Sequence, residues 1–221
     1  MFDPAAVVAD DPLTPDQYRF VGTRAWWIGS GGPASQRYCY LAEHVLAVWV
    51  PAHQRNEWLL DRRTDDGREP GPLEAWWQQP APDFLAGLPR DPRLLYERLQ
   101  SDSPADRPGY CGAFTYAADA LRTGLVPADL RAALYRALLM IPEVRLAEAE
   151  GREAGSGEVS LGLDDGVHLT EIFISSSGGQ FSGERSRLTH DTRELKAGSV
   201  TTSTVVQVSK ADRIGQWPAG K

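Results

Sequence analysis

The sequence contains few of the residues that build metal sites or disulfide frameworks. Among its 221 residues are only two cysteines, Cys39 and Cys111, which are too far apart for the paired C-x-x-C spacing of a zinc site. The four histidines are scattered along the chain, at His44, His53, His168 and His190. From this composition we expect no metal site, and no motif in the chain indicates a cofactor.

Positive charge is also scarce. The chain has 23 basic and 30 acidic residues, which gives a formal net charge of −7 at pH 7, and its arginines form no basic run. A nucleic-acid-binding face needs clustered Lys and Arg to neutralise phosphates. We therefore expect no nucleic-acid partner.

Long hydrophobic runs and common catalytic motifs are missing too. The longest apolar run near the start spans only Ala5 to Ala9, so neither a signal peptide nor a membrane span is expected in the sequence as given. There is no G-x-S-x-G elbow and no H-E-x-x-H motif. The glycine cluster at residues 29–33 lacks the Gly-Lys-Ser/Thr ending of a phosphate loop and predicts a hairpin turn.

The helical signals lie in the middle of the chain. Leucines at Leu130, Leu134 and Leu138 recur at steps of four, which predicts a helix over 128–141 with one buried face. A weaker stripe predicts a preceding helix over 113–123, ended by Gly124. A third helix is expected from Asp91, with Pro92 in its first turn, to about Ser103. The first two would form a helical hairpin.

Strand-like sequence lies on both sides of these helices. Alternating or β-branched runs predict the strands 18–29, 38–51, 53–62, 144–146, 159–163, 167–174, 180–189 and 199–209. Strands, then helices, then strands indicate an α+β fold, with one antiparallel sheet curving over the helices. Residues 1–17 are expected to form an extended lead-in, and residues 18–221 a single domain.

Seven tryptophans are the most suggestive feature of the composition. Two interpretations remain open: the rings fill the core and hold a long loop over residues 67–83, or they line a ligand pocket. On the second interpretation the pocket residues are Trp26, Trp27, Trp49, Trp76 and Trp77.

Glu171 also admits two interpretations. It lies among apolar residues of a predicted strand, where burial would raise its pKa and make it a candidate catalytic acid. Alternatively, Arg185 on the neighbouring strand of the predicted hairpin pairs with it and gives it a structural role.

Several stretches together resemble an uncharacterised actinobacterial family of membrane-anchored proteins. Its members usually carry this domain outside the membrane, behind a cytoplasmic portion and one transmembrane helix. The family's transmembrane helix has no counterpart here, so any membrane attachment is expected through a segment outside this sequence. The stretches that carry the resemblance are LTPDQYRFVGTRAWW (Leu13–Trp27), GLPRDPRLLYERL (Gly87–Leu99), ADLRAALYRALLMIPEVRL (Ala128–Leu146), EIFISSSGGQFSGERSRL (Glu171–Leu188) and VSKADRIGQWP (Val208–Pro218).

The resemblance implies an extracytoplasmic domain, similar by analogy to the half-open β-barrels of lipoprotein carriers, with an apolar cavity between sheet and helices. An oxidising compartment would allow a disulfide between Cys39 and Cys111, whereas two separate thiols remain the alternative. The hypothesis that follows is a non-catalytic sensor or regulator module that binds an apolar small molecule, a lipid or a protein partner. The alternatives are a small cyclase or isomerase of secondary metabolism acting in the same cavity, and a structural interaction domain. If the protein does not belong to this family, a cytoplasmic location is expected.

Overall fold

In the described part of the chain, the helices lie between two groups of strands in sequence order. The computed structural model describes residues 8–31, 38–52, 59–63, 76–103, 109–149 and 158–218. The strands described are β1 (Tyr18–Gly31), β2 (Tyr38–Pro51), β3 (Leu59–Arg63), β4 (Val144–Glu148), β5 (Val159–Asp164), β6 (His168–Ile174), β7 (Phe181–Leu188) and β8 (Val200–Ala211). The helices described are α1 (Pro82–Gly87), α2 (Pro92–Asp102), α3 (Gly109–Arg122) and α4 (Ala128–Leu138).

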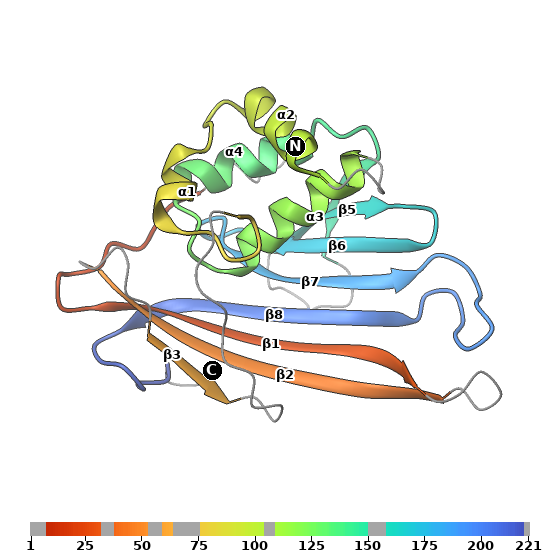
Figure 1. Cartoon of the computed structure of the whole chain (residues 1–221), viewed down its shortest axis with the longest axis horizontal. Helices are drawn as coiled ribbons and strands as arrows, with labels where there is room; N and C mark the ends of the chain where they lie inside the picture. Colours follow the sequence, from red (N-terminus) through yellow and green to blue (C-terminus); the bar gives the residue numbers. More distant parts are fainter. Residues whose placement is uncertain are drawn as a thin grey trace.

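In the described part of the chain the strands form one open, antiparallel sheet of eight. Its order is β3-β2-β1-β8-β7-β6-β5-β4, and the pairing of β1 with β8 brings the first and last strands together in the middle of the sheet (Figure 1). The predicted hairpin of β6 and β7, together with β8, therefore belongs to the same sheet as β1. The α+β fold class is confirmed.

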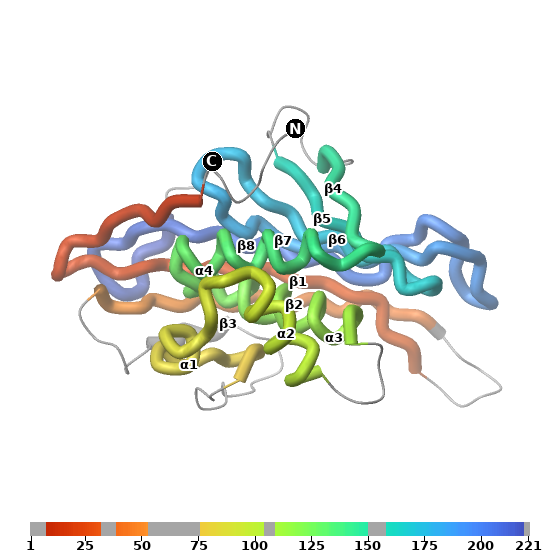
Figure 2. Tube along the Cα trace, turned by 90° about the horizontal axis from the view of Figure 1, so that it is seen from above, coloured from red at the N-terminus to blue at the C-terminus, as the bar shows by residue number. Residues whose placement is uncertain are grey.

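The helices pack together on one face of this sheet (Figure 2). The leucine stripe of α4 is buried as its spacing predicts, because Leu130, Leu134 and Leu138 have no exposed surface. Helix α4 ends at Leu138, earlier than the predicted Ile141, and the chain continues in turns to β4. Burying a leucine side chain stabilises a fold by about 2 kcal/mol, so this stripe fixes α4 in the helical layer.

The helix ends follow from single residues. Asp91 accepts hydrogen bonds from the amides of Arg93 and Leu94, which caps α2 as predicted. Gly124 has a φ of 67°, and a Cβ there would lie 2.9 Å from Val21 on β1. A glycine is therefore needed both for the left-handed turn after α3 and for the close approach of that turn to the sheet.

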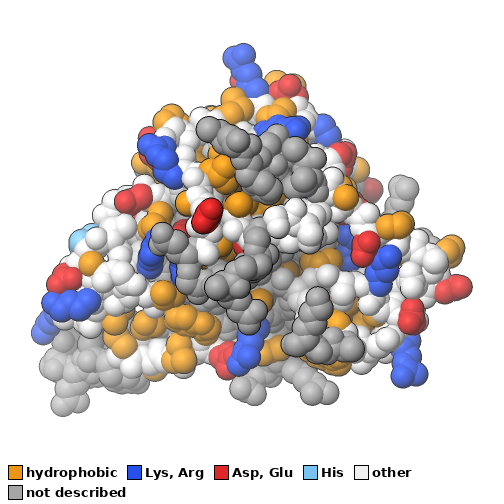
Figure 3. All heavy atoms as spheres, turned by 180° about the vertical axis from the view of Figure 1, so that it is seen from behind, with side chains coloured by type: hydrophobic (Ala, Val, Ile, Leu, Met, Phe, Trp, Pro, Cys, Tyr) orange, Lys and Arg blue, Asp and Glu red, His pale blue; other side chains and the backbone are white. Residues whose placement is uncertain are grey.

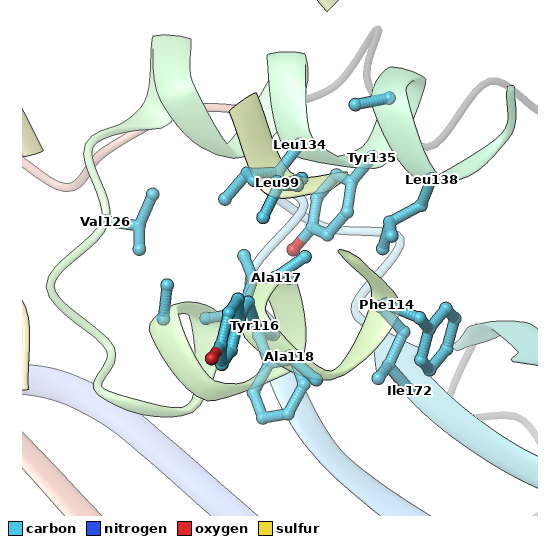
Figure 4. Close-up of a cluster of buried hydrophobic side chains, with 14 of the residues drawn as sticks. Leu99, Phe114, Tyr116, Ala117, Ala118, Val126, Leu134, Tyr135, Leu138 and Ile172 are labelled. Atoms are coloured by element: carbon cyan, nitrogen blue, oxygen red, sulfur yellow. The ribbon is translucent and has the colours of Figure 1, made fainter. Parts of the chain in front are cut away.

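Hydrophobic side chains are buried on both faces of the sheet. The larger cluster joins the helices to strand residues such as Val21, Val48 and Ile172, and Figure 4 shows part of it. A second cluster contains Phe20 and Trp49, whose positions alternate with Val21 and Val48 and which therefore lie on the opposite face. This double burial explains why both alternating sets of residues on β2 are largely apolar.

Further boundaries differ from the sequence-based predictions. Helix α3 begins at Gly109 rather than Ala113, and the short helix α1 lies partly within the predicted loop 67–83. Only the last residues of the predicted strand 53–62 are described, and they belong to β3; residues 53–58 and 67–75 lie outside the described residues. Propensity alone missed α1 because its six residues are too few for a helical repeat.

Candidate functional site

A groove of about 650 Å³ lies between α3 and the strands β5 to β8. Helix α3 forms one wall, and the side chains of the strands, with the turn between β5 and β6, form the floor and the rim. The lining from α3 is Tyr110, Cys111, Phe114, Thr115, Ala118 and Arg122. The lining from the strands and the β5–β6 turn is Leu163, Asp165, Val167, His168, Thr170, Glu184, Arg185, Ser186, Thr201 and Thr202.

The floor of the groove contains a row of side chains that crosses the sheet at right angles to the strands. The register pairs Leu163 with Thr170, Thr170 with Ser186, and Ser186 with Thr202. The Thr170 and Ser186 hydroxyl oxygens are 3.4 Å apart. Exposure increases along the row, from the buried Leu163 to the exposed Thr202. The groove is therefore closed and apolar at one end, and open and hydroxyl-lined at the other.

A charged cluster connects α3 to this floor. Arg122 on α3 donates from Nε to Oε1 of Glu184 on β7 at 3.0 Å, and its Nη2 forms an ion pair with the same oxygen at 2.7 Å. Its Nη1 donates to Oδ1 of Asp119 at 2.9 Å. Burial raises the pKa of Asp119, against the opposing effect of Arg122. Burial lowers the pKa of Arg122, but the charges and hydrogen bonds of Glu184 and Asp119 together outweigh burial, so the net shift is upward.

The groove can therefore hold a ligand by contact and hydrogen bonding. Its hydroxyl groups can both donate and accept hydrogen bonds, while the more exposed Tyr110 and Val167 offer apolar surface. Both Glu184 and Asp119 already accept hydrogen bonds from Arg122. Neither carboxylate is presented as a free general base, and the guanidinium is not presented as a free anion-binding group.

The tryptophans do not gather around this groove, which corrects the predicted tryptophan-lined pocket. Trp49 is fully buried on the opposite face of the sheet, where it contacts Phe20 and Trp217 at centroid distances of 5.3 and 6.0 Å. Trp77 is fully buried in the helical layer, stacked on Tyr116. Each of these two rings is buried by a different cluster.

The remaining three candidate rings also lie outside the groove's lining. Trp76 packs edge-on against Tyr116 in the helical layer. Trp26 and Trp27 point to opposite faces of β1, as neighbours on a strand must, and Trp26 lies on the face away from the helices. Core filling is thus the interpretation that fits Trp49, Trp76 and Trp77.

Glu171 lies on the face of the sheet opposite the groove, because its neighbour Ile172 belongs to the cluster under the helices. Its Oε2 accepts hydrogen bonds from Nε and Nη2 of Arg185, at 3.0 and 2.8 Å, and Nε of Arg187 lies 3.5 Å away. The predicted pairing with Arg185 is confirmed. Glu171 is therefore not an acid in the groove.

The predicted disulfide is not formed, because neither Cys39 nor Cys111 takes part in a disulfide bond. Cys39 and Trp49 are an even number of positions apart on β2, so Cys39 lies on the same face as Trp49, away from the helices. Cys111 belongs to α3, on the other side of the sheet. Strands β1 and β8 also separate β2 from β7, the strand that α3 contacts, which adds about 14 Å. The two thiols cannot meet in this fold.

Sequence reasoning missed the hydroxyl row and the Arg122–Glu184 contact. The Thr- and Ser-rich composition of β8 was an available signal, but it indicated only a strand. The pairing of Arg122 with Glu184 joins residues 62 positions apart, on a helix and a strand, and no local pattern connects them.

No protein-family model, curated protein or solved structure matches the chain. Within the described residues, no group of three or more His, Cys, Asp or Glu side chains is placed to hold a metal ion. No helix in that part of the chain has the length and apolar character to cross a bilayer.

Proposed function

We propose that the protein is a non-catalytic binding module whose ligand occupies the groove between α3 and the strands β5 to β8. The observation that carries this proposal is the volume of the groove, about 650 Å³, combined with its mixed lining. Small-molecule sites have volumes of about 300–1,000 Å³ and combine apolar walls with a few placed polar groups.

The walls of the groove are supported well enough to act as a pre-formed site. Phe114 and Ala118 of α3 are buried and belong to the main hydrophobic cluster, together with Leu163 of β5. The contact between Arg122 and Glu184 fixes the C-terminal end of α3 to the sheet. Ligand binding to a pre-formed site costs less conformational entropy than binding to a mobile loop, so more of the contact energy contributes to affinity.

The resemblance to membrane-anchored proteins supports an extracytoplasmic location and a sensor or regulator role. On this proposal, a partner protein recognises the groove rim and α3 when the groove is occupied. The groove has a mixed rather than an apolar lining, so the proposal does not require the lipid-like ligand expected from the sequence.

Titration with the neutral fluorescent dye N-phenyl-1-naphthylamine tests whether the groove binds small molecules. The wild-type protein is expected to enhance the fluorescence of the dye saturably. Thr115 is half-buried in the α3 wall, so Thr115→Trp places a large ring in the groove and should weaken dye binding by at least about tenfold. Leu94→Trp, at an exposed position of α2 outside the lining, is the matched control and should bind as the wild type does.

Equal dye binding by wild type and Thr115→Trp, with both folded by circular dichroism, would contradict the proposal. Turnover is tested separately, by mass spectrometry of compounds recovered after long incubation with the protein. Unchanged masses support a binding module. New products that disappear with Glu184→Gln would instead favour an enzyme acting in this groove.

A further inference from the structure

The row of side chains on the floor of the groove continues beyond its open end. The register pairs Thr202 of β8 with Trp27 of β1, and Trp27 with Ala42 of β2. Trp27 and Val21 are an even number of positions apart on β1 and therefore lie on the same face. Val21 packs under the helices, so the Trp27 ring is on the groove side of the sheet. Thr170, Ser186, Thr202 and Trp27 therefore form one continuous row over four neighbouring strands.

A second aromatic ring lies next to Trp27 on the same face. Tyr40 pairs with Gly29, two residues after Trp27, and is therefore its diagonal neighbour. A Cβ on Gly29 would be only 2.4 Å from the Tyr40 ring, so the ring lies against the glycine backbone. Trp27 and Tyr40 are 41% and 49% exposed, and they present aromatic surface to solvent. We call these two residues the aromatic platform.

We propose that the groove and the aromatic platform together bind a neutral oligosaccharide; this inference rests on the proposed function of the groove. A sugar ring has an apolar C–H face, which packs on an aromatic ring, and hydroxyl groups along its edges. The row offers both partners side by side: exposed rings at one end, then the hydroxyl groups of Thr202, Ser186 and Thr170.

The chemistry of the row argues against an acyl chain. An acyl chain lying on Ser186 and Thr170 would remove their hydroxyl groups from water without offering a hydrogen bond, which is unfavourable. Aromatic rings left half-exposed beside hydroxyl groups suit a ligand that remains partly solvated, as a sugar chain does.

The charges near the row argue against an anionic ligand. The guanidinium of Arg122 is occupied by Glu184 and Asp119. Arg185, the other arginine of the lining, donates to Glu171 on the opposite face. Asp165 at the rim would repel an anion. A ligand without charge loses nothing at these positions, so a neutral sugar fits better than a phosphate or a uronic acid.

The length of the row sets the size of the ligand. Thr170 and Trp27 are separated by three strand spacings, about 14 Å. The repeat of an extended sugar chain is close to one strand spacing, so the row accommodates about three rings. A tetrasaccharide should therefore bind more tightly than a disaccharide of the same sugar.

The test uses isothermal titration calorimetry of the full chain with cellotetraose, maltotetraose and chitotetraose, and with the matching disaccharides. At least one tetrasaccharide is expected to bind and to displace N-phenyl-1-naphthylamine. Trp27→Ala should weaken binding by about tenfold, because the stacking surface is lost. Trp26→Ala is the matched control, since its ring lies on the opposite face, and it should change affinity by less than about twofold. Ser186→Ala should also weaken binding by several-fold.

The outcomes separate this inference from the proposed function. If the dye binds the groove but none of the three tetrasaccharides binds, the oligosaccharide inference is wrong and the groove remains a small-molecule site. Equal weakening by Trp26→Ala and Trp27→Ala would also overturn it, because the platform would then have no special role. If neither dye nor sugar binds, the proposed function fails as well.

Discussion

Arg122 on α3 and Glu184 on β7 attach the helical layer to the sheet beside the groove. Two N–H groups of the guanidinium reach the same carboxylate oxygen, Oε1, at 3.0 and 2.7 Å. The Thr204 hydroxyl lies 3.4 Å from that oxygen. The helix wall and the strand floor of the groove are therefore held at a fixed separation by one ion pair, surrounded by the buried cluster.

The first prediction concerns this ion pair. Glu184→Gln should lower the free energy of unfolding by about 1–2 kcal/mol, since Arg122 keeps Asp119 as a partner and is itself partly exposed. Urea denaturation measures the change. Glu97→Gln removes the exposed pair with Arg93 on α2 and serves as the control, with an expected loss below about 0.5 kcal/mol. Equal losses in the two variants would show that the pair does not hold α3.

The N-terminal lead-in is also fixed to the helical layer, through Asp10. Its carboxylate accepts hydrogen bonds from Arg131 Nη1 at 2.7 Å and from the amide of Ala128, at the start of α4, at 2.8 Å. Burial of Asp10 raises its pKa, but these two hydrogen bonds and the charges of Arg131 and Arg19 together outweigh burial, so the pKa is lowered from 3.8. Asp10 therefore caps a helix that lacks a side-chain cap of its own.

The second prediction follows from the sign of this shift. A carboxyl group with a lowered pKa in the folded state stabilises the fold fully above pH 3.8, and this contribution is lost as the pH falls through the lowered value. Asp10→Asn should cost about 1–2 kcal/mol at pH 7 and progressively less below pH 3.8, by urea denaturation across pH. Asp11→Asn, at a neighbouring and largely exposed carboxylate, should cost little at any pH. A constant difference between wild type and Asp10→Asn down to pH 2 would contradict this.

Elements whose signal lies within one stretch of sequence were predictable, and contacts between distant stretches were not. The leucine spacing predicted the buried face of α4, and the pair Asp91-Pro92 predicted the start of α2. The pairing of Glu171 with Arg185 was also accessible, because hairpin register places residues of adjacent strands opposite each other. The contact between Arg122 and Glu184 depends on where α3 docks, and no local pattern encodes this.

The tryptophans show the same limit. Their number indicated that large rings had to be buried, and burial of Trp49 and Trp77 is complete. The residues on both faces of β2 are largely apolar, so the sequence pattern did not indicate which face packs under the helices. The pocket interpretation therefore included Trp49, whereas the structure buries it against Phe20 and Trp217, with its Nε1 donating to the carbonyl of Gln216 at 3.1 Å.

The third prediction tests the state of the two thiols. Because Cys39 and Cys111 lie on opposite sides of the sheet, the folded protein should show two thiols that react with Ellman's reagent, even after exposure to air. Cys39 is exposed and should react first, while the half-buried Cys111 reacts more slowly. Cys39→Ser should leave only the slow phase. Loss of both thiols in a monomeric, non-reduced sample would indicate a bridge and contradict this fold.

The last prediction separates a structural from a catalytic role for Glu171. Its side chain is only 7% exposed and faces away from the groove, and two arginines surround its Oε2. Glu171→Gln would leave the largely buried Arg185 without a carboxylate partner, which should cost about 3 kcal/mol of stability. Glu43→Gln removes the exposed pair with Arg24 on the same face and should cost less than about 0.5 kcal/mol.

Binding in the groove gives the second measurement on the same variant. Binding is measured without urea, at a temperature where Glu171→Gln remains folded. The affinity of this variant for N-phenyl-1-naphthylamine should equal that of the wild type, because the sheet backbone separates the carboxylate from the groove lining. A catalytic acid would behave in the opposite way, since its loss would affect reaction or binding while stability stayed nearly constant. Intact stability combined with a lost groove function would therefore restore Glu171 as a site residue. A large loss of stability with unchanged binding assigns Glu171 to the support of the sheet.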